Sequence, residues 1–418
     1  MESLEEKERG LSQGRAWAYA VLAVLGLTWL VLGATDWGMR FRWFQWHRRL
    51  IFRPPVVRAP TPAAAEYVTN LVPEWRGGDL TRLVGIRSVV APFEDVRPGG
   101  SEIMDAEGFR NAPVPPDVVP SIVVVGDSFM ASGEPMTNMF ALRLSALADR
   151  PVCNRAVFGV GPFISFVNFV DSDRFKTNPP RMLIWGFVER EIIRHGFSSL
   201  CYQLDIREKG VVPPEHLQLR ARAEKKKWLF SWRELSSTRL KKSLPDTSAF
   251  AQYAQKIWNQ LRYVLFRELP PEVVVSTGDV QGRRLLLYAP AVRINLGDPS
   301  ERNPEEITWA IGVARDFLAK RGIQLVVVMI PDKETVYQEL IPPGLLGGRE
   351  LPPSCLDVLE PRLHSIGVPV VNLLPAFRAA AAGGELLYWP DDTHWNERGI
   401  RLAAEQTWTL IAPRLPPP

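Results

Sequence analysis

Cysteine and histidine are scarce in this chain, which has three cysteines and five histidines among its 418 residues. The cysteines, Cys153, Cys201 and Cys355, form no CxxC pair and no Cys/His cluster, which excludes the common zinc and dithiol redox motifs. So few cysteines do not decide the redox compartment. The sequence also lacks a glycine-rich loop that could cradle phosphates, so we expect no metal and no nucleotide cofactor.

A strong net charge is also lacking, because 50 Lys and Arg residues nearly balance 46 Asp and Glu residues, for a net charge of +4. Residues 36–60 carry +5 and residues 205–245 carry +6, so the rest of the chain is acidic. Two basic patches on an acidic chain do not indicate a general nucleic-acid binder, and we expect no nucleic-acid partner. Hydrophobic residues make up 46%, which excludes a disordered chain.

One long uncharged run is present, the 19 residues AWAYAVLAVLGLTWLVLGA at 16–34. It is long enough to cross a hydrocarbon core of about 30 Å. Tryptophans and arginines alternate in residues 36–52, as in a segment at a membrane interface. A cleavable signal peptide is the alternative, but the acidic start of the chain and Leu32 near the cut disfavour it. We therefore expect a tail at 1–15, a transmembrane helix at 16–35 and a lipid bilayer as partner.

The orientation of this helix is open from the sequence. The positive-inside rule places the arginine-rich side, and with it the large domain, in the cytoplasm. The chemical motifs described below favour an extracytoplasmic domain. Residues 36–78 are expected to be an interfacial segment and a Pro/Ala-rich linker, followed by one large domain at 79–412.

Within this domain, apolar runs predict buried parallel strands at 121–129, 181–187, 323–331 and 368–374. Helices are expected at 139–148 and 303–322. Strands that alternate with helices predict an α/β fold, a parallel sheet with helices on both faces.

Residues 200–300 interrupt this alternation and are expected to form a helical and hairpin insertion, with the hairpin at 272–296. The insertion contains a basic run at 220–242. This run is either the solvated face of a helix or a surface that contacts anionic lipid or an acidic polymer.

Gly126-Asp127-Ser128-Phe129 lies at the end of the first predicted strand, which places Ser128 at the carboxyl edge of the sheet. A serine nucleophile needs a base, and the base needs a carboxylate that fixes its tautomer. His394, in Asp391-Asp392-Thr393-His394, is the one of the five histidines with aspartates two and three residues before it. Either Asp391 or Asp392 could serve as that carboxylate.

The pairing of Gly-Asp-Ser-Phe with a late Asp-x-His resembles the SGNH (GDSL) hydrolase superfamily. Asp105-Ala-Glu-Gly-Phe-Arg-Asn111 is similar to a motif of secreted SGNH-like proteins. Ile330-Pro-Asp-Lys-Glu-Thr-Val-Tyr337 and Asp392-Thr-His-Trp395 resemble the alginate O-acetyltransferase-like branch. The resemblance covers about residues 100–412 and implies a three-layer, flavodoxin-like fold.

Carried over to this sequence, the resemblance makes Ser128 the nucleophile and His394 the base. Asp392 matches the Asp-x-His spacing and Asp391 the Asp-x-x-His spacing of ordinary SGNH esterases. The Ser128 N–H and Gly159 would form the oxyanion hole.

The chain departs from the family pattern in two ways. In SGNH proteins a third conserved block ends in Gly-x-Asn, and the asparagine amide completes the oxyanion hole. The equivalent residues here, 186–191, contain no asparagine. Arg190 could replace the amide as a donor or could form an ion pair with Glu189 or Glu191. The serine precedes the Asp-Thr-His-Trp element, as in ordinary SGNH proteins, whereas the alginate enzymes have the reverse order.

Three further residues are candidates for substrate binding. Lys333 could contact an anionic substrate or be a solvated loop lysine. Trp389 and Trp395 flank His394 and could stack on a sugar ring or anchor their loop in the core.

The sequence supports two functions. The first is a membrane-anchored O-acetyltransferase or esterase that forms an acyl-Ser128 intermediate and acts on an envelope or exported polysaccharide. The resemblance then implies a multi-spanning membrane O-acyltransferase as acyl donor and a periplasmic or otherwise extracytoplasmic domain. The second is a catalytically silent module that acts as a binding or scaffold subunit.

Overall fold

The computed structural model describes residues 17–34 except 18, 29, 32 and 33, then 57–58, 67–85, 93–105, 107–114, 118–159, 161–209, 249–295, 302–349 and 351–415. Contacts divide the chain into two compact units. One consists of residues 55–229 and 259–418, and the other of residues 1–54 and 230–258. The larger unit contains the sheet and all of the candidate site residues.

A five-stranded parallel sheet forms the centre of the larger unit, in the order β12-β11-β8-β6-β7. Its strands are buried on both faces, which explains their nearly continuous apolar sequences. The four predicted strands are confirmed, and β7 is an additional one that is only three residues long. The bounds are β6 Ile122–Gly126, β7 Val152–Asn154, β8 Met182–Val188, β11 Gln324–Ile330 and β12 Val370–Asn372.

The strand order has one switch point, between β6 and β8. The chain leaves β6 towards β7 on one side, and from β8 it continues through β11 to β12 on the other. In open α/β sheets, the loops at such a switch point diverge and leave a crevice at the carboxyl ends of the strands. Ser128 begins the helix that follows β6, so the topology places it at this crevice.

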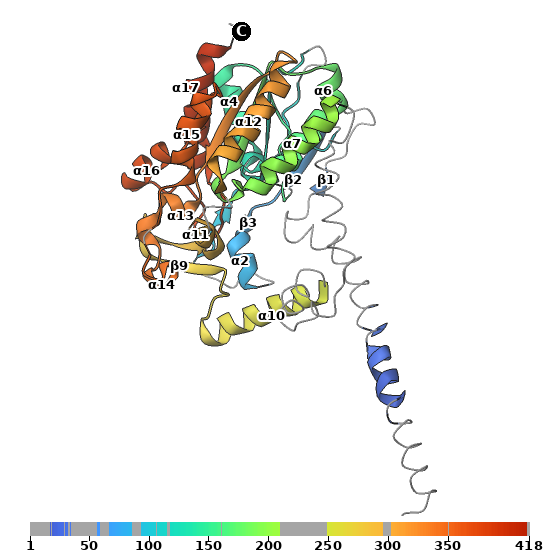
Figure 1. The fold of residues 1–418 in the computed structure, drawn as a ribbon. Helices are drawn as coiled ribbons and strands as arrows, with labels where there is room; N and C mark the ends of the chain where they lie inside the picture. Colours follow the sequence, from blue (N-terminus) through green and yellow to red (C-terminus); the bar gives the residue numbers. More distant parts are fainter. Residues whose placement is uncertain are drawn as a thin grey trace, which may run out of the picture. The chain divides into compact units, whose positions relative to one another are not determined.

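Helices cover both faces of the sheet, as predicted for an α/β fold (Figure 1). On one face α4 (Phe140–Ala148) packs beside α17 (Glu397–Ile411). On the other face, α12 (Pro304–Ala319) lies between α7 (Arg194–Lys209) and α15 (Cys355–Ser365), and α5 (Gly161–Asp171) packs beside α7. Asn303 caps α12 by accepting hydrogen bonds from the N–H groups of Glu305 and Glu306.

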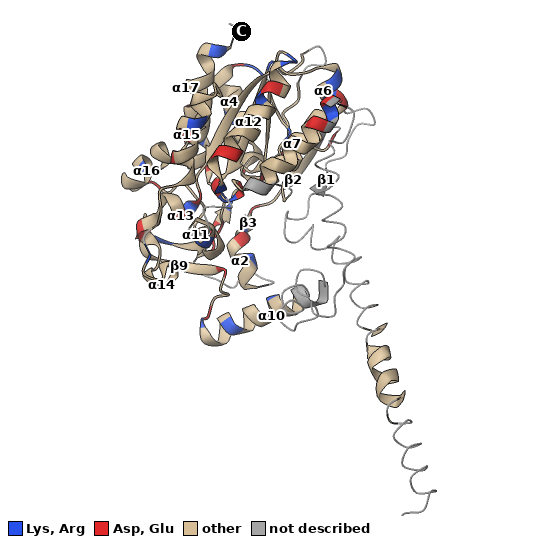
Figure 2. Cartoon of the chain, viewed as in Figure 1, with Lys and Arg blue, Asp and Glu red and all other residues tan. Residues whose placement is uncertain are grey.

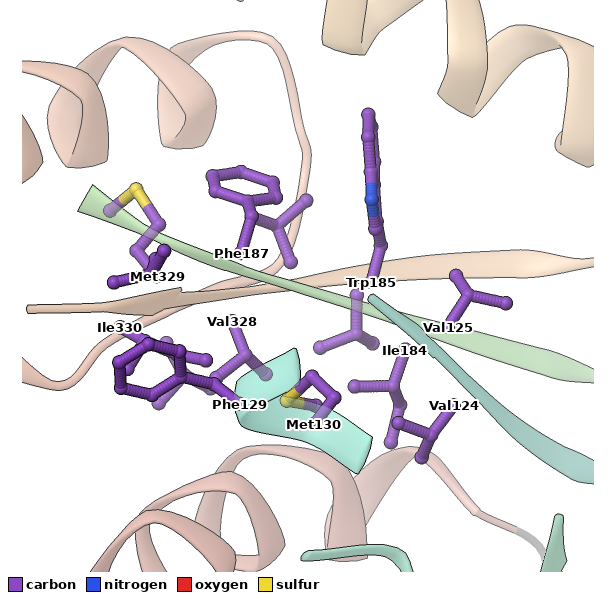
Figure 3. Close-up of a cluster of buried hydrophobic side chains, with 14 of the residues drawn as sticks. Val124, Val125, Phe129, Met130, Ile184, Trp185, Phe187, Val328, Met329 and Ile330 are labelled. Atoms are coloured by element: carbon purple, nitrogen blue, oxygen red, sulfur yellow. The ribbon is translucent and has the colours of Figure 1, made fainter. Parts of the chain in front are cut away.

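The core around β8 has two sides (Figure 3). Trp185 and Phe187 project to one side, where they meet the Phe197 ring edge-on or tilted. Phe129 and Met130, which follow Ser128 in α3, fill the other side. The core thus holds the residues next to Ser128 in a fixed place.

Several described segments of the chain before the sheet form strands and a helix. β2 (Tyr67–Val72) pairs antiparallel with β5 (Gly100–Asp105), and β3 (Trp75–Arg76) pairs with β4 (Val96–Arg97). The short helix α2 (Asp79–Val84) lies in the chain between β3 and β4. The run Tyr-Val-Thr-Asn-Leu-Val forms β2, the central strand of the sheet β1-β2-β5, within the segment predicted as a linker. The domain start at residue 79 stays a prediction.

The predicted hairpin is present as β9 (Val273–Val280) and β10 (Arg283–Tyr288). Its turn residues Gln281 and Gly282 have φ angles of +51° and +71°, as in a two-residue hairpin turn that matches the strand twist. The insertion also contains α10 (Ala249–Phe266), and the basic run at 220–242 lies outside the described residues. The remaining elements are β1 Val57–Arg58, α3 Ser128–Ala131, η1 Met136–Asn138, α6 Asp173–Thr177, η2 Glu189–Glu191, α11 Ala289–Asn295, α13 Lys333–Val336, η5 Gln338–Leu340, α14 Pro343–Leu346, α16 Leu374–Ala382 and η6 Ala412–Arg414.

The uncharged run at 16–34 is helical at its described positions, residues 17, 19–28, 30–31 and 34. Within the described part of the chain, no helix has both the length and the apolar character that a bilayer span requires. The predicted interfacial segment at 36–52 lies outside the described residues.

The packing of Met130 against glycine backbone gives a test of this core. A Cβ atom on Gly186 would lie 2.4 Å from Met130 Sδ and 2.6 Å from its Cγ, and Met130 is fully buried. We expect Gly186→Ala to lower the free energy of unfolding by about 1–3 kcal/mol, the usual cost of overpacking. Urea denaturation measures this, and Gly344→Ala, where a Cβ meets no atom within 4 Å, is the matched control.

If the cost comes from Met130, it should shrink in a Met130→Ala background, because the two substitutions then share one space. Additive effects of Gly186→Ala and Met130→Ala would contradict this explanation.

Candidate active site

Ser128 lies at the first position of α3, directly after β6. The preceding residue, Asp127, is buried and caps this helix: its carboxylate accepts hydrogen bonds from the N–H of Phe129 and from the N–H of Val188, both at 2.9 Å. Burial raises the pKa of Asp127. Asp127 therefore ties the turn after β6 to the end of β8, which fixes the direction of the Ser128 side chain.

A chain of hydrogen bonds connects Ser128 to the loop at 391–394. The Ser128 Oγ lies 2.7 Å from His394 Nε2, and His394 Nδ1 lies 2.6 Å from Asp392 Oδ1. Asp392 Oδ1 also accepts the backbone N–H of His394, at 3.0 Å. Of the two carboxylates that the sequence left open, Asp392 is the one that contacts the imidazole.

The electrostatics of this chain suit a base. Burial alone would raise the pKa of Asp392, but the adjacent His394 outweighs it and holds the pKa well below its ordinary value. Burial alone would lower the pKa of His394, but Asp392 outweighs it and raises the pKa. The pair thus favours a charged carboxylate and an imidazole that accepts a proton readily.

Asp391 points away from His394 and is fully buried against the N-terminal part of the domain. Its carboxylate lies 2.7 Å from an Arg97 guanidinium nitrogen, and it accepts the N–H groups of Gly78 and Asp95 at 3.1 and 2.9 Å. The Arg97 guanidinium also lies over the Trp389 ring, 4.2 Å from its centre. Asp391 therefore fastens the histidine loop to residues 78–97.

Gly78 is needed for this close approach. A Cβ atom at this position would lie 2.3 Å from the Asp391 carbonyl oxygen and 2.5 Å from Asp392 Cβ. No sequence pattern would have identified Gly78 or Arg97, because 313 and 294 residues, respectively, separate them from Asp391 in the loop that they contact.

Asp79, the first residue of α2, is a second carboxylate near the imidazole. Its Oδ1 accepts the N–H of Thr393 at 2.7 Å, and its Oδ2 accepts the Thr393 hydroxyl and lies 3.6 Å from His394 Nδ1. Its own N–H donates to Asp392 Oδ2 at 3.0 Å. The side chain of Asp79 is 38% exposed, and its partial burial together with the neighbouring Asp392 raises its pKa to about 6. Sequence reasoning missed this residue.

Arg190, on η2, also lies near Thr393, but its ion pair differs from the predicted alternatives. It pairs with the buried Asp332, rather than with Glu189 or Glu191, and one of its nitrogens lies 3.4 Å from the Thr393 hydroxyl. Burial would lower the pKa of Arg190, but Asp332 outweighs it and raises the pKa. The guanidinium carbon lies 5.2 Å from the centre of the Phe129 ring, next to Ser128.

Acidic and basic residues both occur around α2, α11 and α13 (Figure 2).

Two of the three residues predicted to bind substrate are parts of the core. Lys333 is fully buried and donates to the Asp392 carbonyl oxygen at 2.6 Å, so it is not a solvated loop lysine and does not face a substrate. Trp395 is 1% exposed and donates to the Phe129 carbonyl oxygen at 3.0 Å, so stacking on a sugar is excluded. Trp389 is partly buried, with Arg97 over its ring.

Gly159 lies in the exposed loop between β7 and α5, with a φ of +74°. This left-handed conformation suits glycine and allows the backbone to turn at the edge of the crevice. The assignment of Gly159 to the oxyanion hole remains a prediction.

The two other family motifs, at residues 105–111 and 330–337, support the site without being part of it. Arg110 is buried and donates to the carbonyl oxygens of Ala131 and Gly133, at the end of the helix that begins with Ser128. Tyr337 accepts the N–H of Leu387 at 2.9 Å and donates to the Glu385 carbonyl oxygen at 2.8 Å, just before the histidine loop. Both motifs therefore position the chain segments that carry Ser128 and His394.

Comparison with known proteins agrees with this arrangement. The family described as "SGNH hydrolase-like domain, acetyltransferase AlgX" matches residues 59–189 and 286–417. Three similar proteins are each named "Probable alginate O-acetylase AlgJ". The one from Pseudomonas syringae pv. tomato is 27% identical over 175 residues, which cover 41% of each chain. Those from Azotobacter vinelandii and Pseudomonas aeruginosa are 29% and 32% identical over 161 residues, which cover 38% and 36% of each chain.

The similarity thus spans about two fifths of the length of these relatives, whereas the family match covers more than half of this chain. The resemblance inferred from the Gly-Asp-Ser-Phe and Asp-Thr-His-Trp elements is confirmed. The chain belongs to the family of SGNH hydrolase-like domains typified by the acetyltransferase AlgX.

Proposed function

We propose that this protein is an O-acetyltransferase that forms an acyl-Ser128 intermediate and passes the acetyl group to a hydroxyl of an envelope or exported polysaccharide. The observation that carries the proposal is the hydrogen-bonded series Ser128, His394 and Asp392 at the switch point of the sheet. The names of the AlgJ relatives supply the substrate class, a polysaccharide such as alginate.

In the first step, Ser128 Oγ attacks the acyl carbon while its proton passes to His394 Nε2. Asp392 stabilises the imidazolium, and the imidazolium then gives the proton to the leaving group of the donor. In the second step, His394 takes a proton from the acceptor hydroxyl, which attacks the acyl group, and Ser128 regains its proton. Water in place of the acceptor would make the protein an esterase.

The developing oxyanion needs donors. We propose the Ser128 N–H, at the start of α3, together with Gly159, and the Arg190 guanidinium in place of the asparagine that residues 186–191 lack. Each such donor would contribute about 2.7–4 kcal/mol to stabilisation of the transition state. Arg190 is bound to the buried Asp332, so its charge is already oriented before a substrate arrives.

A catalytically silent scaffold module is the alternative. A silent site would have Ser128 out of reach of His394 or a serine with no base beside it. The distance of 2.7 Å between Ser128 Oγ and His394 Nε2 favours the enzyme.

We further propose that residues 16–35 anchor the protein in a membrane and that the large domain is extracytoplasmic, where an exported polysaccharide would be accessible. The uncharged run of 19 residues supports the anchor. Acetyl groups would then come from a multi-spanning membrane O-acyltransferase, which delivers them across the bilayer to Ser128.

The nucleophile is tested with p-nitrophenyl acetate. We expect a burst of p-nitrophenol equal to the enzyme concentration, and a loss of at least about 10³-fold in kcat for Ser128→Ala. Ser365→Ala, a substitution of an exposed serine on α15, should keep wild-type kinetics. Added acceptor polysaccharide should speed the turnover of the acetyl-enzyme. An unchanged burst in Ser128→Ala would refute the mechanism, and no burst in the wild type would favour the scaffold.

The two adjacent aspartates should separate into a catalytic and a structural role. We expect Asp392→Asn to lower kcat by about 10⁴-fold, because the imidazole loses the carboxylate that fixes its tautomer. Asp391→Asn should mainly lower stability, by about 3–5 kcal/mol, because it leaves the Arg97 charge buried without its closest partner. Kinetics and urea denaturation of both variants measure the two effects, and the reverse pattern would contradict the assignment.

The membrane anchor is tested by cell fractionation. We expect the full chain to stay in the membrane fraction after alkaline carbonate extraction, and a variant that lacks residues 1–35 to be released. A reporter that is active only outside the cytoplasm, fused to the C-terminus, should be active. A cytoplasmic C-terminus would remove the polysaccharide proposal.

A further inference from the structure

Asp79 is a carboxylate in the site that the Ser128, His394 and Asp392 series does not use. It comes from α2, about 300 residues before the histidine loop, and accepts two hydrogen bonds from Thr393, the residue between Asp392 and His394. Its Oδ2 lies 3.6 Å from the same imidazole nitrogen, Nδ1, that binds Asp392. Two carboxylates from distant parts of the chain thus face one ring nitrogen.

The hydrogen bonds of Asp79 fix the loop on which the base is carried. Because Asp79 accepts both the N–H and the hydroxyl of Thr393, this residue cannot turn without breaking two bonds. The N–H of Asp79 in turn donates to Asp392 Oδ2, at 3.0 Å. Asp79, Thr393 and Asp392 therefore form a closed set of bonds around the backbone of His394.

The charge of Asp79 acts on the ring as well. Asp79 and Asp392 both favour the imidazolium, whereas Arg190, from η2, and burial oppose it. Other cations in the field of Asp79 are Arg82, on the same helix, and the buried Lys333. A neutral residue at position 79 would leave Asp392 as the one carboxylate at hydrogen-bond or ion-pair distance from the ring among the described residues.

We propose that Asp79 is a positioning residue for His394: it holds the histidine loop through Thr393 and places a second carboxylate beside the imidazole nitrogen that binds Asp392. The inference rests on the proposed role of His394 as the base. It also gives residues 78–97 a part in the chemistry, because this N-terminal segment supplies the carboxylate.

A metal ion is a different use of the same groups. One ligand atom each of Asp79, Asp392 and His394 lies within 4.8 Å of the others. However, His394 Nδ1 is hydrogen bonded to Asp392, and His394 Nε2 is hydrogen bonded to Ser128, so no ring nitrogen is left for an ion. Treatment with EDTA should therefore change neither the titration of His394 nor the activity.

The test is the pKa of His394 in the full chain, which has five histidines. Histidine labelled with ¹³C at Cε1 gives one NMR signal per residue, and His394→Gln identifies the signal of interest. We expect Asp79→Asn to lower the pKa by about one unit, because the imidazolium loses a nearby negative charge. An unchanged pKa in Asp79→Asn would overturn the proposal.

Two variants separate charge from position. Thr393→Val keeps the Asp79 charge but loses the hydroxyl contact, so the pKa of His394 should stay and kcat should fall about three- to tenfold. Asp173→Asn is the matched control, since Asp173 is an exposed carboxylate in the first turn of another short helix, α6. It should change neither quantity.

Kinetics with p-nitrophenyl acetate complete the test. A base must be unprotonated in the free enzyme, so kcat/KM falls on the acid side as His394 gains a proton. Asp79→Asn should move this acid limb to lower pH by the same amount as the NMR titration, while Asp79→Ala should also lower kcat by about 10- to 100-fold.

The two proposals can fail separately. If the NMR titration shifts but the wild type shows no Ser128-dependent burst, the proposed function fails and Asp79 still sets the pKa of His394. If the burst is present and neither the titration nor the acid limb shifts, the role of Asp79 fails alone.

Discussion

The buried pair of Arg97 and Asp391 is the interaction on which the site depends. Asp391 is fully buried and Arg97 is 1% exposed, and the guanidinium also reaches Asp392 at 3.4 Å. A buried ion pair adds little to stability by itself, since desolvation offsets its attraction, but loss of one partner is costly. The ion pair instead fixes the position of the histidine loop against residues 78–97. Asp392 then directs Oδ2 towards Arg97 and Oδ1 towards His394.

The remaining contacts of the loop act in the same direction. Lys333 donates a hydrogen bond to the Asp392 carbonyl oxygen, and Trp395 donates one to the carbonyl oxygen of Phe129, the residue after Ser128. Lys333 and Trp395, which the sequence suggested as substrate contacts, thus hold two short segments in place. One segment carries Ser128 and the other carries His394. Preorganisation of this kind suits the acid–base chemistry proposed for the site, because the distance between Ser128 and His394 must be right before a substrate binds.

The sequence was sufficient for four of the five sheet strands and for the two candidate residues Ser128 and His394, because these have local signals. The strands at 122–126, 182–188 and 324–330 are continuous apolar runs, and Ser128 and His394 lie in short motifs. It was insufficient for Asp79, Arg97 and Gly78, whose importance comes from contacts with residues about 300 positions away. The sequence also could not predict the roles of Lys333 and Trp395, because the same local sequence is compatible with a side chain that points into solvent and with one that is buried in the core.

The separation of Ser128 and His394 by 266 residues has a consequence for the time at which the site forms. At about 5–20 residues per second, a ribosome needs roughly 13–53 s to add that stretch of chain. During this interval the serine segment and the N-terminal segment that carries Asp79 exist without the histidine loop. The hydroxyl of Ser128 therefore has no imidazole beside it until translation has passed residue 394, so the proposed acyl-Ser128 intermediate cannot form on the nascent chain before then.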